Sequence, residues 1–264
     1  SMKEIKHPLG IGIEHKVLTF GDIYSLFSNS GYGVILNQQI RYDRYKPEEI
    51  GNTEWENLLG VDVNNLKHLS LTYGLTRRFL DYCASPPLSW SKAVSAAAQF
   101  SEADEEILLL TTITHDWAEA LVGDKIFDLR TNQEEQKEEI TQEEIMFALL
   151  NPVIKSESLQ VMIKTVGATI KDKTSKLGQA FNAIERLGYL RTGLRAWQKA
   201  KEIGPVQNQE LASHLLWLTN NVFLNQIPKL LEYSEIYPPN SLYLSNMRTT
   251  ISQLFTEMPE NSRT

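Results

Sequence analysis

The residues with the clearest chemical potential lie in the stretch "THDWAEALVGD", residues 114–124, which follows a run of apolar residues. It contains four side chains that can bind a metal or move a proton: His115, Asp116, Glu119 and Asp124. Burying ionised groups costs on the order of several kcal/mol each unless they are paired, hydrogen-bonded or bound to a metal. An imidazole and an adjacent carboxylate in one cavity are part of a site for a divalent transition metal. The stretch therefore predicts a metal site whose other ligands come from elsewhere in the chain.

A further ligand can be sought among the five histidines of the chain. His68 lies near the start of a strongly apolar segment, residues 65–83, which is expected to be a helix packed against the core. A lone histidine in such a helix is commonly a core imidazole that bonds to a backbone carbonyl. Because His115 and Asp116 already predict a metal site, His68 becomes the candidate for a third ligand.

The elements that position these residues are predicted to be helices, because apolar residues recur at helical spacing and alternating strand patterns are scarce. The first 60 residues are less regular and suggest loops and short helices. The charge run in 132–150 is interpreted as the solvated face of a helix that enters the core at its apolar end. Helices are predicted over residues 65–83, 91–99, 102–122, 132–150, 157–170, 174–200 and 207–232.

The helix over 102–122 carries the motif, with Ser101 as its N-cap and Gly123 as its terminator. In a continuous helix, residues 115 and 119 share one face, and residue 116 lies about 100° away from 115. Residue 124 then falls in the turn just after the helix.

Composition limits the classes of function. The 264 residues are 42% apolar and 22% charged, which is ordinary for a soluble globular protein. A net charge of −7 argues against binding to a nucleic acid polymer or an anionic membrane. The single cysteine excludes an internal disulfide, and neither a membrane-spanning run nor a signal-peptide pattern is present. We expect one cytoplasmic all-α domain over residues 1–264.

The composite of His68, the "HD" pair at 115–116, Glu119 and "GD" at 123–124 resembles the HD-domain metal-dependent phosphohydrolases. The phrase "HDWAEALVGD" is most similar to the branch that includes bacterial 5′-deoxynucleotidases. The resemblance covers roughly residues 60–195. It implies an HD-type helical bundle over 60–195, flanked by an irregular segment, 1–59, and a helical one, 196–264.

The resemblance also implies the ligands of one divalent transition metal ion, for which Mn, Co, Fe, Ni and Zn are all possible. The family pattern H…HD…D assigns His68, His115 and Asp116. Its last aspartate precedes Arg–Leu, and in "FNAIERLGYLRTGL", residues 181–194, Glu185 occupies that place. Glutamate is also an oxygen donor and can reach a metal, although Glu185 can instead pair with a nearby arginine. Asp172 is the alternative ligand.

The mechanism implied by this ligand set is metal-assisted hydrolysis, in which the ion activates water and stabilises charge on a phosphoryl group. Glu119 and Asp124 are the expected catalytic residues, either of which can orient or deprotonate the water or protonate the leaving group. Phosphate also requires a cation from the protein, and the sequence does not choose among several. The candidates are Lys67, Arg77, Arg78, Lys125 and Lys171.

The expected substrate is a small phosphoester, most simply a nucleoside monophosphate. Two alternatives remain open: an HD hydrolase of another nucleotide class, and a non-catalytic HD-fold binding or regulatory protein. Ala120 counts against the alarmone branch, which usually reads "HD-x-x-E-D". Aromatic residues in the C-terminal region are either core residues or the surface of a homodimer: Trp217, Tyr233 and Tyr237.

Overall fold

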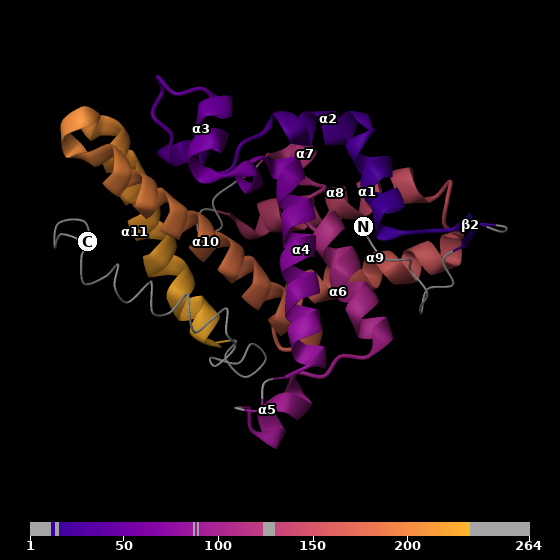
Figure 1. Cartoon of the computed structure of the whole chain (residues 1–264). Coiled ribbons are helices and arrows are strands. Elements are labelled where there is room, and N and C mark those ends of the chain that lie inside the picture. The colour runs from indigo at the N-terminus through magenta and orange to yellow at the C-terminus, as the bar shows by residue number, and fades with distance from the viewer. Residues whose placement is uncertain (1–11, 14–15, 87, 89, 124–129, 233–264) are drawn as a thin grey trace. The chain divides into compact units, whose positions relative to one another are not determined.

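The structure, a computed structural model, describes residues 12–13, 16–86, 88, 90–123 and 130–232 (Figure 1). Helices dominate it, which confirms the predicted all-α fold. The strands in the described residues are β1 (Gly12–Ile13) and β2 (Lys16–Val17), which pair antiparallel. The α-helices are α1 (Phe20–Ser28), α2 (Gly31–Gln38), α3 (Asn52–Leu59), α4 (Asn65–Ala84), α5 (Lys92–Ala97), α6 (Glu102–Thr114), α7 (Glu119–Val122), α8 (Asn132–Leu150), α9 (Ser156–Lys171), α10 (Lys176–Gln207) and α11 (Gln209–Glu232), with short 3-10 turns at Asp43–Tyr45 and Val61–Val63.

The chain divides into two compact units. The first unit comprises residues 1–41, 64–80 and 100–181, and the second comprises 42–63, 81–99 and 182–264. Because α4 and α10 each pass from one unit into the other, neither unit is a continuous segment. That residues 1–264 form one domain, with its core at residues 60–195, stays a prediction.

Helix α6 is the central helix of the first unit. Ser101 caps it by accepting a hydrogen bond from the backbone N–H of Asp104, as predicted. Every residue from Glu106 to Thr114 is buried, and the helix packs against α1 and α9 (Figure 1). A helix buried on all sides needs apolar or small side chains around its whole circumference, which "ILLLTTIT" supplies.

The continuous helix predicted over 102–122 is wrong. Helix α6 ends at Thr114, a turn occupies residues 115–118, and the short helix α7 begins at Glu119. Gly123 ends α7 with a φ of 78°, a conformation that glycine adopts without steric cost, as the predicted terminator requires. The other helices lie within a few residues of their predicted positions, except that α10 continues beyond 200.

The second unit is built largely from α3, α11 and the part of α10 that follows residue 181. Helices α10 and α11 approach closely at Gly193, where an added Cβ would lie 3.0 Å from the Val222 side chain. The Thr219 hydroxyl donates to the Gly193 carbonyl there. Trp217 is 39% exposed and packs edge-on against the Tyr45 ring, whereas Tyr233 and Tyr237 lie outside the described residues.

Within the described part of the chain, no helix combines the length and the apolar character that crossing a membrane requires.

Candidate metal centre

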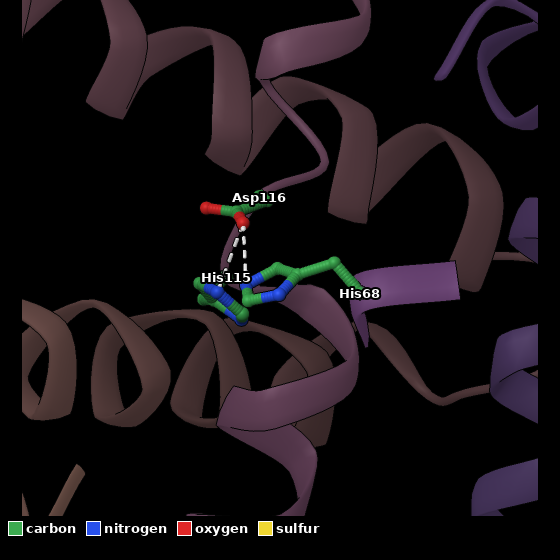
Figure 2. Close-up of side chains that lie close together, drawn as sticks. All are labelled: His68, His115 and Asp116. Atoms are coloured by element: carbon green, nitrogen blue, oxygen red, sulfur yellow. Dashed lines mark ion pairs between the residues drawn. The ribbon is translucent and has the colours of Figure 1, made fainter. Parts of the chain in front are cut away.

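Three of the predicted ligands meet in the first unit. His68 comes from the first turn of α4, and His115 and Asp116 come from the turn that directly follows α6. One ligand atom from each lies within 4.8 Å of the others (Figure 2). Asp116 Oδ2 is 3.0 Å from His115 Nε2 and 3.5 Å from His68 Nε2. Both imidazoles are buried, and the carboxylate is nearly so.

The ring orientation of His115 suits a metal ligand. Its Nδ1 lies 2.8 Å from the backbone carbonyl oxygen of Thr112. Because a carbonyl oxygen can only accept a hydrogen bond, Nδ1 carries the proton and donates it, which leaves a lone pair on Nε2. A histidine that ligates a metal is typically held in this way through its second nitrogen. The bond fixes both the tautomer and the direction of Nε2, toward Asp116.

A side chain from α8 stabilises the turn that follows α6. Gln142 is buried, accepts a hydrogen bond from the Ala118 backbone N–H at 2.8 Å and donates one to the Thr114 carbonyl. These bonds bridge the residues on either side of His115 and Asp116. Trp117 anchors the same turn, since its indole N–H donates to the Ile113 carbonyl and its ring stacks on Phe27. The turn that carries His115 and Asp116 is therefore held from both α8 and α1.

The donor set fits a divalent transition metal. Two imidazole nitrogens and one carboxylate oxygen, buried and close together, are ligand types that such ions bind. The ring of Phe181 lies edge-on to His115 at a centroid distance of 5.1 Å and forms an apolar wall beside it. Apolar surroundings lower the local dielectric and strengthen the attraction between a cation and its ligands.

Arg41 adds a positive charge that the sequence reasoning missed. It is buried, and its Nη1 lies 3.6 Å from Asp116 Oδ2. No pattern in "NQQIRYDRY" distinguishes this arginine from Arg44, which lies in the second unit. The folded chain therefore provides a phosphate-binding candidate beside the ligands that was absent from the predicted set.

Glu119, predicted as a catalytic residue, is 4% exposed at the start of α7. Asn65 Nδ2 lies 3.4 Å from its Oε2, and Arg130 Nη2 lies 3.9 Å from its Oε1. Gln39 donates to the Glu119 backbone carbonyl and accepts from Asn65. The carboxylate is thus held by an amide on one oxygen and a guanidinium on the other. Its acid–base role stays a prediction.

Asn65, Arg130 and Gln142 are a second group that sequence reasoning missed. A signal existed for Gln142, because it shares a face of α8 with the buried Ile145 and Met146. A polar side chain in an apolar stripe indicates a buried hydrogen bond. No comparable signal marks the other two.

The roles of two predicted site residues stay predictions. Asp124 lies outside the described residues, as does the predicted cation Lys125. Glu185 lies on α10 in the second unit, whose position relative to the first is not determined, so its role as the fourth ligand stays a prediction. Arg186, the arginine next to Glu185 in the sequence, donates to Gln226.

Asp172, the alternative ligand, is an exposed residue at the C-cap of α9. Its carboxylate accepts hydrogen bonds from the hydroxyl and backbone N–H of Thr174 and from the Ser175 N–H. The hydroxyl bond is the main reason that the pKa of Asp172 lies below its usual value. Asp172 is therefore a turn-forming residue.

The remaining predicted cations are divided by exposure. Lys67 and Arg78 are exposed on α4, and Arg77 is half-buried. Lys171 forms an ion pair with Glu139 of α8.

No protein-family model matches the chain, and searches of curated proteins and of solved structures find no similar protein.

Proposed function

We propose that this chain is a metal-dependent phosphohydrolase that acts on a small phosphoester, most simply a nucleoside monophosphate. The observation that carries the proposal is the buried group of His68, His115 and Asp116, with His115 held through Nδ1 so that Nε2 is directed toward Asp116. The likeness of "HDWAEALVGD" to the HD-domain phosphohydrolases supports the same reading.

The ion, one divalent transition metal held by these ligands and by Glu185, would polarise a phosphoryl oxygen and activate water at neutral pH. Arg41 would bind a non-bridging phosphate oxygen, since its guanidinium lies beside Asp116. Glu119 would orient or deprotonate the water, its carboxylate held by Asn65 and Arg130. Asp124 would act on the leaving group.

The burial of the ligands matters for this chemistry. A phosphate that reaches Arg41 replaces water around two buried imidazoles and a nearly buried carboxylate. Electrostatic interactions are stronger in such a water-poor site than at an exposed surface. In the proposed mechanism the ion and Arg41 would act together on one phosphoryl group.

The test is a panel of phosphoesters, including nucleoside mono-, di- and triphosphates and cyclic nucleotides, assayed with Mn, Co, Fe, Ni and Zn in turn. We expect hydrolysis of at least one small monoester that falls more than about 100-fold in Asp116→Asn, since even the outer partners of a metal site are worth about 10–100-fold. Asp43→Asn, at an exposed carboxylate, is the matched control.

Hydrolysis that is unchanged in Asp116→Asn would overturn the proposal. Absence of hydrolysis with every ion and substrate, in a protein that binds metal, would favour the non-catalytic HD-fold binding protein instead.

A further inference from the structure

A pocket of about 260 Å³ opens beside His115, wholly within the first unit, between α8 and α9. His115 itself is part of the lining. Apolar side chains form much of the remaining wall: Met146, Ile163, Val166 and Ile170. A space of this size, next to a candidate metal ligand, is near the lower end of ligand-binding pockets, which hold about 300–1,000 Å³. It suits one compact organic group.

Glycine at position 167 keeps part of this space open. Gly167 lies in α9 and lines the pocket, and a Cβ added to it would meet no atom within 4 Å. Alanine is more favourable than glycine inside a helix, so neither helix formation nor packing against the chain explains why this position lacks a side chain. A ligand in the pocket would explain the glycine, because a larger side chain at position 167 would project into the space that the ligand fills.

The charges of the pocket oppose an anionic occupant. Three cations are among the described lining residues: Arg130, Lys171 and Lys173. Arg130 is paired with Glu138, and Lys171 is paired with Glu139. Two further carboxylates, Glu135 and Glu143, also line it. The described lining thus carries four carboxylates against three cations, two of which already have carboxylate partners, and a second phosphate would meet net repulsion.

From the shape and charge of this pocket we propose that it binds the alcohol released by hydrolysis, and that this alcohol carries an amino group which donates to the carboxylates. The inference rests on the proposed function, and it specifies the substrate further. A nucleoside with adenine or cytosine has the required flat apolar body and exocyclic amino group. Hypoxanthine and uracil place a carbonyl oxygen there, which a carboxylate repels. Carboxylates accept from the cytosine amino group in the same way when proteins read DNA bases.

The experiment measures binding of free nucleosides to the metal-loaded protein by calorimetry or ligand-observed NMR, so that it does not depend on catalysis. Two matched pairs serve as probes: deoxycytidine with deoxyuridine, and deoxyadenosine with deoxyinosine. We expect the amino-bearing member of each pair to bind about tenfold more tightly, the effect of one hydrogen bond to a charged acceptor.

Two variants locate the binding. Gly167→Leu fills the pocket and is expected to weaken nucleoside binding at least about tenfold, while Gly74→Leu is the control. Gly74 is also helical, also has no atom within 4 Å of an added Cβ, and is not among the pocket residues. Glu143→Gln is expected to reduce the preference for the amino-bearing base.

Equal affinities within each pair, or nucleoside binding that survives Gly167→Leu, would overturn this inference even if the protein hydrolyses phosphoesters. The proposed function fails separately, through the absence of metal-dependent hydrolysis, whatever the nucleoside binding shows.

Discussion

Gln142 offers a quantitative test of how the turn at 115–118 is held. Its Oε1 accepts from the Ala118 N–H, and its Nε2 donates to the Thr114 carbonyl, which also accepts from the Trp117 N–H. Gln142→Met keeps the volume of the side chain and removes both bonds. The Thr114 carbonyl keeps one donor, whereas the Ala118 N–H loses the side-chain oxygen that it faces. A buried N–H without an acceptor costs about 1–3 kcal/mol, and that is the expected loss of stability.

The same change should reach the metal centre, because the turn sets the positions of His115 and Asp116. Outer partners of metal ligands are typically worth about 10–100-fold in affinity, and we expect a loss in that range for Gln142→Met. Urea denaturation followed by circular dichroism gives the stability, and calorimetric titration with Mn or Co gives the affinity. Glu144→Met, at an exposed position on α8, is the control and should change stability by less than about 0.5 kcal/mol. Unchanged metal affinity in a destabilised Gln142→Met protein would refute the link between the turn and the centre.

Three further predictions concern the surrounding residues. Glu185→Ala should lower metal affinity by about 10–100-fold, whereas Asp172→Ala should not, and calorimetry of both decides which acidic residue completes the ligand set. Arg130→Gln should lower kcat about tenfold with little change in KM, because the guanidinium orients the Glu119 carboxylate. Arg130→Lys should restore part of the lost kcat. Steady-state kinetics in which only KM changes would contradict this prediction. Asp172→Asn should be less stable than the wild type at pH 7, and its stability should approach that of the wild type below about pH 4. Folding lowers the pKa of Asp172, so the ionised carboxylate stabilises the fold at a pH above its pKa in the unfolded chain. That stabilisation is lost as the pH falls through its pKa in the folded chain. If the melting temperatures of the wild type and Asp172→Asn differ by the same amount at pH 7 and at pH 3, the prediction is wrong.

The helices were predictable because their signals are local. Helix α8 begins and ends at the predicted residues, since Thr131 and Glu134 form a capping box and the charge run becomes apolar toward Leu150. Helix α6 begins where Ser101 caps it, for the same reason. The cluster of His68 with His115 and Asp116 was predictable from residue type and a buried helical context. The distances between their ligand atoms were not.

The break in α6 was not predictable, because its cause lies far along the chain. Residues 114–122 have no glycine or proline, the two residues that most strongly break a helix. The turn is stabilised by Gln142, which is 24 residues from Ala118, and by the stacking of Trp117 on Phe27. Such tertiary hydrogen bonds override propensity. Arg41 was missed for the same reason, since only folding places it beside Asp116.

The central claim is that His68, His115 and Asp116 hold one divalent metal ion. Elemental analysis of the purified protein, before and after incubation with Mn, Co, Fe, Ni and Zn and removal of free ions, tests it most directly. We expect about one ion per chain in the wild type and almost none in a folded His115→Ala variant, since each lost ligand costs at least the roughly 10–100-fold of an outer partner. A folded wild-type protein that stays metal-free with every ion, or a His115→Ala variant that retains a full equivalent, would contradict it.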